Sequence, residues 1–298
     1  MSAIRTNVLR ESEVWTSLVD IKHQTPNIPA MISLNTRQFP SSKNELAQAL
    51  ENAIRRFAQK TGPIVTVRSA SFPHFDEITV NLDGVHLDSS FPAPPRIEAE
   101  TEPACGATVV TLSARNISVR GVPMDLRMEA HDAAFYKGQD ENGEAVLIFR
   151  GARDGTLAIS ATQLDLEEAI AKIGGQEARR HGITIDQVRL AIHARSARSV
   201  AADVRIQARK FLLRTSIGVH VQLDVGDDLV AKVSQLKCRG EGAIGSLVCG
   251  VLEPYLRRLD GHTFPLNSLP FGEIQLRDLR VAVADSVEVV ADFGSAVS

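Results

Sequence analysis

Val219-His-Val-Gln-Leu-Asp-Val225 alternates apolar and polar residues at every position. A period of two puts successive side chains on opposite faces of a strand, so the stretch predicts a strand with one apolar face. His220, Gln222 and Asp224 then share the face away from the core. Three neighbouring stretches also predict strands: 183–190, 200–206 and 229–238. The C-terminal half is therefore predicted to contain an antiparallel meander.

Helical spacing flanks these strands on both sides. Ser42-Lys-Asn-Glu45 is a capping box, in which the serine hydroxyl and the glutamate carboxylate satisfy free backbone amides. Apolar residues then recur at helical intervals and predict a helix over 42–61. A second apolar stripe predicts a helix over 243–259, kinked at Pro254. A third helix is predicted after Thr162, broken or bent at 174–175.

Period-two patterns dominate residues 64–150 and the C-terminal tail. Asp83-Gly84 and Asn142-Gly143 provide turns between the predicted strands. The tail over 271–293 predicts a hairpin, with a bulge near Arg277-Asp278 that keeps one face buried. Helix followed by sheet thus occurs twice, which predicts an α+β protein. We expect one domain over 42–298, in halves of about 42–154 and 155–298, after an N-terminal segment over 1–41 that holds a short helix and a linker.

Composition narrows the possible partners and compartments. The 298 residues include 33 Lys and Arg against 36 Asp and Glu, a net charge of -3 that does not favour nucleic acid. No apolar run reaches the roughly 18 residues needed to cross a membrane, and the N-terminus lacks the apolar core of a secretory signal. We therefore expect a soluble, cytoplasmic protein, with at most weak membrane contact through residues 1–21. The three cysteines are expected to be buried or half-buried thiols.

The sequence contains no recognisable catalytic, cofactor or metal-binding motif. Phosphate-binding glycine loops and the nucleophile elbow are absent, and the eight histidines are dispersed without metal-ligand spacing. The glycines near 240–250 are expected to allow close packing of the helix that follows. We therefore expect no cofactor, no metal and no catalytic residue. This pattern favours a binding protein over an enzyme.

Several segments together resemble bacterial proteins of the DUF2993, or LmeA-like, family. They are Gly155–Leu164, the apolar helix 243–259, Leu259–Leu266 and Leu269–Leu279, together with helix 42–61 and Val65–Phe75. That family is similar to the tubular lipid-binding (TULIP) superfamily. The resemblance implies a strongly curved antiparallel sheet that wraps around long amphipathic helices and encloses an apolar groove.

The same resemblance implies that the protein binds or carries a lipid or another long apolar ligand in that groove. The residues expected to line it are Ile54, Phe57, Leu247, Val248, Val251, Leu252 and Tyr255. Arg257 and Arg258 lie near a helix end, where the dipole favours cations and where an anionic head group would fit. Two alternatives stay open: an enzyme acting on a hydrophobic substrate in the same cavity, and a structural or assembly protein with a filled core. The sequence does not indicate an oligomeric state.

Overall fold

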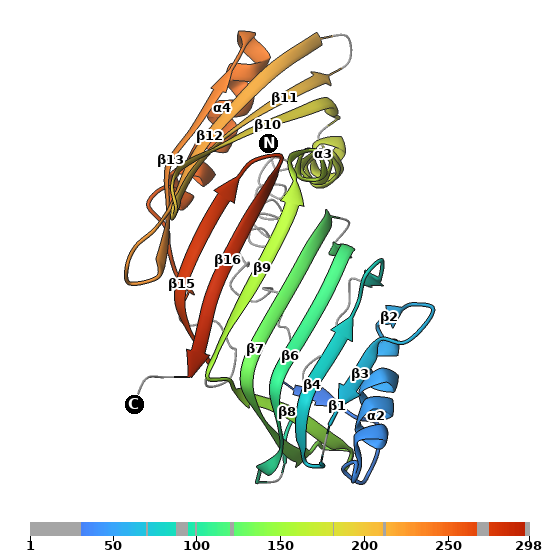
Figure 1. The fold of residues 1–298 in the computed structure, drawn as a ribbon. Coiled ribbons are helices and arrows are strands. Elements are labelled where there is room, and N and C mark those ends of the chain that lie inside the picture. The colour runs from blue at the N-terminus through green and yellow to red at the C-terminus, as the bar shows by residue number, and fades with distance from the viewer. Residues whose placement is uncertain are drawn as a thin grey trace.

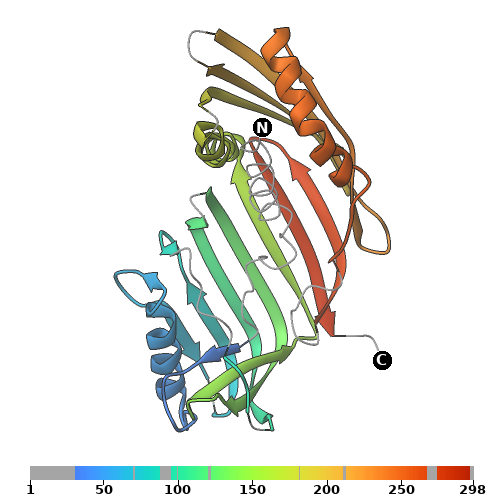
Figure 2. The same cartoon turned by 180° about the vertical axis from the view of Figure 1, so that it is seen from behind.

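Two open β-sheets make up most of the protein (Figures 1 and 2). The computed structural model describes residues 31–69, 71–87, 95–98, 100–119, 122–180, 182–210, 213–266 and 274–295. The predicted N-terminal helix and most of its linker lie outside these residues. The first sheet has 11 strands and the second has five.

The first sheet is built on seven strands in the order β15-β16-β9-β7-β6-β4-β3. These strands are β3 (Val65–Arg68), β4 (His74–Asn81), β6 (Glu102–Val119), β7 (Val122–Gln139), β9 (Asp154–Thr162), β15 (Ile274–Val283) and β16 (Ser286–Ser295). Four shorter strands join it: β1 (Met31–Ser33), β2 (Ala58–Gln59), β5 (His86–Leu87) and β8 (Ala145–Gly151). The strand pairs are antiparallel, except that β4 and β5 run parallel to β6.

The second sheet is the antiparallel meander expected from the alternating stretches. Its strands are β10 (Thr184–Ser196), β11 (Ser199–Lys210), β12 (Leu213–Val225), β13 (Val230–Gly240) and β14 (Thr263–Pro265). The strand predicted at 219–225 is confirmed as the second half of β12. In the first sheet, the predicted hairpin is β15 and β16, and the bulge falls between Leu276 and Asp278 as expected.

The described helices are α2 (Lys43–Arg55), α3 (Gln163–Arg180) and α4 (Gly242–Leu259). The hydroxyl of Ser42 caps α2 by accepting the backbone amide of Glu45 at 3.3 Å. The Glu45 carboxylate accepts the amide of Ser41 at 2.7 Å, one residue earlier than the predicted box requires. α2 ends at Arg55, before the predicted end at 61, and β2 begins at Ala58. α3 continues through 174–175, where a break or bend was predicted.

The predicted TULIP-like fold is wrong. The described helices have at most 18 residues, and the sheet is neither strongly curled nor closed around them. Instead α2 lies against β3, α3 against β10 and α4 against β13 (Figures 1 and 2). An apolar stripe indicates that one face of a helix is buried, but it does not indicate which strand that face packs against. The two sheets also do not coincide with the predicted halves, because β9, β15 and β16 complete the first sheet.

The main core lies between one face of the first sheet and the segments α2, β1 and β8. Leu34, Leu46 and Ile64 are each at most 2% exposed there. Glu51 fastens α2 to the sheet, since its carboxylate accepts the backbone amides of Ile64 at 2.8 Å and Val65 at 2.7 Å. Burial opposes ionisation of Glu51, but these hydrogen bonds and Arg55 outweigh it and lower the pKa of the carboxyl group.

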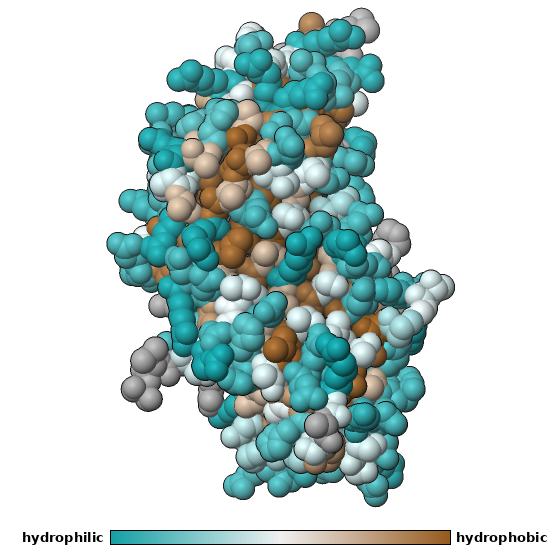
Figure 3. Space-filling view, in the orientation of Figure 1, coloured by the Kyte–Doolittle hydropathy of each residue, from teal (hydrophilic) through white to brown (hydrophobic). Residues whose placement is uncertain are grey.

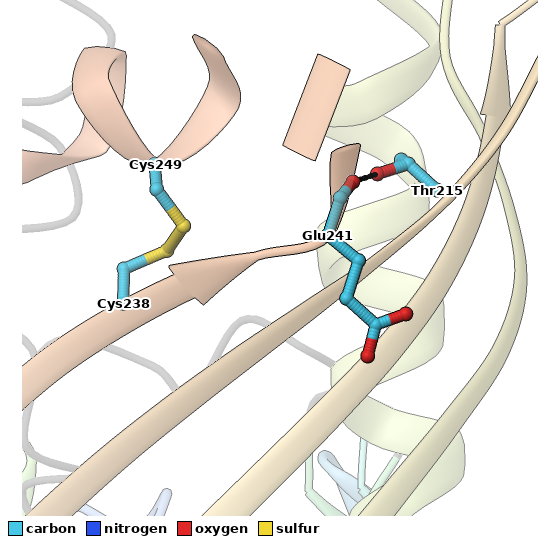
Figure 4. The surroundings of a disulfide bond; sticks show 4 residues. All are labelled: Thr215, Cys238, Glu241 and Cys249. Carbon is cyan, nitrogen blue, oxygen red and sulfur yellow. Dashed lines mark hydrogen bonds between the residues drawn. A yellow bond between two sulfur atoms is a disulfide. The ribbon is translucent and has the colours of Figure 1, made fainter. Parts of the chain in front are cut away.

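A disulfide joins α4 to β13, so the expectation of three thiols is wrong for two of them. Cys238 and Cys249 are bonded, with their Cα atoms 5.5 Å apart, and Cys105 is free and buried (Figure 4). The predicted close packing of the glycines is confirmed. A Cβ atom on Gly245 would lie 2.7 Å from Thr215 Oγ1 and 2.8 Å from the carbonyl carbon of Gly240. The start of α4 therefore lies directly against the strands it follows.

Candidate functional site

One face of the first sheet carries apolar side chains in rows that cross its strands. The register aligns two rows of four residues across β7, β9, β16 and β15: Leu126, Ile159, Val289 and Val281, and then Met128, Leu157, Ala291 and Leu279. Residues directly opposite one another on neighbouring strands share a face of the sheet. These eight residues are called the apolar strip below.

The apolar strip is half-buried, and the residues between its members lie on the other face, where Arg127 and Arg280 are exposed and Ala158 and Val290 are half-buried. Arg127 and Glu129 on β7, and Glu288 on β16, point to the opposite face and are exposed. An antiparallel sheet with one covered face and one solvated face shows this alternation. The strip is thus the less buried part of an otherwise packed face. Figure 3 views the first sheet from the face opposite the strip, and hydrophobic side chains also reach the surface there, around β15, β16 and the adjoining strands of the second sheet.

The apolar face continues without a break from the strip into the main core. Leu112 on β6 lies opposite Met128, and Val80 on β4 lies beside Leu112. Toward β3 and β4 this face is covered by α2, and in Figure 2 β1 and β8 cross in front of the strands. Among the described residues this cover is lighter over β15, β16 and β9, where the strip residues are half-buried. The α2 side of this face is called the closed end below, and the β15 side is called the open end.

Phe293 lies at one end of the strip along β16. It lies opposite Gly155 on β9 and is 8% exposed. Gly155 permits this contact, because a Cβ atom there would collide with the phenyl ring and lie 2.6 Å from the carbonyl oxygen of Glu129. From Val289 to Phe293 the strip and its end cover about 13 Å of strand, at roughly 3.3 Å per residue. Four strands give it a width of about 14 Å.

The structure places the predicted ligand residues of the first helix in the main core. Ile54 is in α2 and is 7% exposed. Phe57 follows the end of α2 and packs, half-buried, against the same core. Both residues therefore stabilise the closed end of the first sheet.

The remaining predicted residues lie in α4, on the second sheet. Leu247 is 69% exposed and Val248 is half-buried. Val251, Leu252 and Tyr255 belong to α4, but their side chains lie outside the described part of the structure. Arg257 is exposed and pairs with Glu253 at 2.6 Å, and Arg258 is also exposed. The structure does not bring these residues together with Ile54 and Phe57, because α2 and α4 lie on different sheets (Figure 1).

Sequence reasoning found the strands of the strip but not the strip itself. Strand patterns were predicted over 64–150 and in the tail over 271–293, and the pairs Leu126/Met128 and Leu157/Ile159 show the alternation. What the sequence does not show is that β9 lies between β7 and β16. That pairing decides which apolar residues become neighbours.

The clearest polar cluster on the first sheet lies on the face opposite the strip. His131 Nδ1 is 2.7 Å from Asp154 Oδ1, and its Nε2 is 3.0 Å from Glu129 Oε1. The hydrogen bond with Asp154 is the main reason that the pKa of His131 is raised. Across the described residues, no group of three or more His, Cys, Asp or Glu side chains is placed to hold a metal ion.

No protein-family model, curated protein or solved structure matches the chain. The resemblance to DUF2993 proteins stays a prediction from sequence. Within the described ranges no helix is both long enough and apolar enough to span a membrane.

Proposed function

We propose that the protein binds a long apolar molecule, such as the acyl chain of a lipid, on the apolar strip of the first sheet. The observation that carries this proposal is the pair of cross-strand rows led by Leu126 and Met128, which are apolar over four strands and only half-buried. The proposal keeps the ligand class expected from sequence. It moves the site from the helices to the sheet.

The strip suits this ligand in shape and in chemistry. Each methylene group moved from water to an apolar surface contributes roughly 0.8 kcal/mol, so an acyl chain along the strip needs no polar recognition. The eight strip residues are all aliphatic or Met, and none is charged. The strip is about 14 Å wide across its four strands, from the strand spacing, and accommodates part of an extended chain. Affinity is therefore expected to rise with chain length until the strip is filled.

Val289 and Val290 provide a matched test, because they are adjacent, identical and half-buried but lie on opposite faces of β16. Val289→Asn introduces a polar group into the strip, and Val290→Asn introduces the same group on the other face. We expect Val289→Asn to raise the Kd for a fluorescent long-chain fatty acid about tenfold, equivalent to about 1.4 kcal/mol. We expect Val290→Asn to leave the Kd unchanged.

Fatty-acid titrations of the two variants and the original protein measure this effect, and thermal unfolding shows whether each variant is folded. A fatty-acid series of increasing length adds a second readout. Equal effects of the two substitutions, or the same affinity for short and long chains, would contradict binding on the strip. Failure of the original protein to bind any member of the series would remove the proposal altogether.

We also infer that the protein resides in an oxidising compartment. The bond between Cys238 and Cys249 supports this placement, since disulfides persist in such compartments and are rare in the reducing cytosol. The cytoplasmic location expected from the N-terminal sequence is the competing prediction. Fractionation of the producing cells, with alkylation before lysis, tests the two locations by showing where the disulfide-bonded form is found.

A further inference from the structure

The polar face of the second sheet contains a hollow lined by cationic side chains. It has a cavity volume of about 590 Å³ and is lined from β11, β12 and β13. Arg205, Lys237 and Arg239 all line it. A second hollow of about 830 Å³ adjoins it, shares Arg205 and adds Arg209 and Arg214. The two hollows are called the basic hollow below.

The strand register explains why the basic hollow is open at its centre. Arg205 on β11 lies opposite Gly218 on β12, which lies opposite Arg239 on β13. Two arginines on one face are therefore separated by two strand spacings, roughly 10 Å. Gly218 has no side chain to fill the space between them. Long guanidinium side chains can reach inward from both sides to a group above Gly218.

Few acidic groups offset these cations. The basic hollow has five cationic side chains and three acidic ones, although the whole chain has a net charge of -3. Asp203 is engaged by His220 Nδ1 at 2.8 Å, and Asp186 pairs with Arg209 at 3.1 Å. Glu241 is the third acid.

The cations nearest Gly218 are exposed and have no partner among the described protein groups. In the part of the chain that the structure describes, the side chains of Arg205, Lys237 and Arg239 make no ion pair or hydrogen bond. Three such cations around one space repel one another, and a bound anion relieves that repulsion. Guanidinium groups match tetrahedral oxyanions well, because their planar donors form two parallel hydrogen bonds.

From this arrangement we propose that the basic hollow binds a phosphate group above Gly218, between Arg205 and Arg239. The ligand chemistry is a dianionic terminal phosphate, as in a phosphate monoester, supplied by a free phosphorylated compound or by a phospholipid head group. The site is separate from the apolar strip, which is on the first sheet. The proposal of phosphate binding is therefore tested independently of fatty-acid binding.

Two probes distinguish the two sources of phosphate. Pyrophosphate, measured by calorimetry, represents a free phosphorylated compound, and phosphatidylcholine vesicles with and without phosphatidic acid represent a head group. We expect the double variant Arg205→Gln/Arg239→Gln to raise the Kd for the bound probe at least tenfold. Arg127→Gln, which removes an exposed arginine from the first sheet, is expected to change nothing.

Glu241→Gln provides a test that loss of folding cannot imitate. Glu241 is exposed at the rim of both hollows, and its side chain points away from the disulfide in Figure 4. Removing its negative charge should lower the Kd for the phosphate probe. Pyrophosphate binding with this pattern identifies a free phosphate ligand, and selective binding to phosphatidic acid vesicles identifies a lipid head group. No binding of either probe, or binding that the double variant leaves unchanged, would overturn the proposal.

Discussion

Arg198 binds Asp278 through two nitrogens, with its Nε at 3.1 Å and its Nη2 at 2.5 Å from Asp278 Oδ1. Arg198 lies in the turn between β10 and β11 of the second sheet, and Asp278 lies on β15 of the first. The backbone amide of Val281 donates to the carbonyl of Ala197 at 2.7 Å beside this pair. These contacts connect the edges of the two sheets.

Asp278→Asn should weaken the connection between the sheets. The side chains of Arg198 and Asp278 are each about one-third exposed. The expected loss of stability is therefore only about 1 kcal/mol. Hydrogen exchange should speed up at the amide of Val281. Asp292→Asn removes a partner of Arg280 within the first sheet and serves as the control. Equal exchange at Val281 in both variants would contradict a specific role for Asp278.

The same pair should respond to acid. The hydrogen bond from Arg198 is the main cause that lowers the pKa of Asp278 in the folded protein. A lowered folded-state pKa means that the stabilisation is complete above the unfolded value, 3.8, and is lost as the pH falls through the folded value. The protection factor at the amide of Val281, which corrects for the slower intrinsic exchange in acid, should therefore fall toward pH 3 in the original protein. In Asp278→Asn this part of the pH dependence should disappear, and its persistence would assign the effect to other carboxylates.

Glu51→Gln should destabilise the closed end of the first sheet. Oε2 of the carboxylate accepts both backbone amides at the start of β3, and Oε1 accepts from Arg55. A neutral amide is a weaker acceptor, and its NH2 group cannot replace the second oxygen. The expected cost is about 1–3 kcal/mol, measured by denaturant unfolding. Glu168→Gln changes an exposed glutamate on α3 and should cost less than about 0.5 kcal/mol. Similar losses in both variants would show that Glu51 has no special role.

Thiol counting should separate the three cysteines. In the native protein no thiol should react rapidly at pH 8, because Cys238 and Cys249 are bonded and burial raises the pKa of Cys105 to about 11. Denaturation without reductant should expose one thiol, and reduction should expose three. Cys238→Ser/Cys249→Ser should cost about 3 kcal/mol, as expected for closing a loop of this length. Three reactive thiols after denaturation alone would show that the bond is absent.

Gly155→Ala should destabilise the protein by more than about 2 kcal/mol, since the added methyl group would collide with Phe293 and the β7 backbone. Gly250→Ala is the matched control, because a Cβ atom there meets nothing within 4 Å. In a helix this control should be neutral or stabilise by up to about 1 kcal/mol. Thermal unfolding compares the two variants, and a small effect of Gly155→Ala would mean that Phe293 does not lie against β9.

Local patterns predicted local structure well. The cap at Ser42, the helix 243–259 and the bulge near Asp278 depend on residues close together in the sequence, and each was found as expected. The disulfide was missed because Cys238 and Cys249 meet only once α4 folds back onto β13.

The global arrangement depends on pairings between distant strands. β16 lies beside β9, more than 120 positions earlier in the chain, and periodicity carries no information about such a pairing. The same limit applies to the candidate sites. The alternation around His220 showed that polar side chains share one face, but not that Arg205 and Arg239 flank Gly218.

β7 changes partners along its length. It pairs with β9 from Asp125 to His131 and with β8 from Ala134 to Gln139, and the positive φ of Asp132, 49°, falls at the changeover. A single continuous strand therefore belongs to both the closed and the open end of the sheet. The backbone that carries Leu126 is held in place by the main core, against which Leu126 itself packs. Binding of a ligand on the strip therefore restricts the protein backbone little further. Because β7 runs through both ends, local opening of the open end should occur together with unfolding of the main core and not as a separate event.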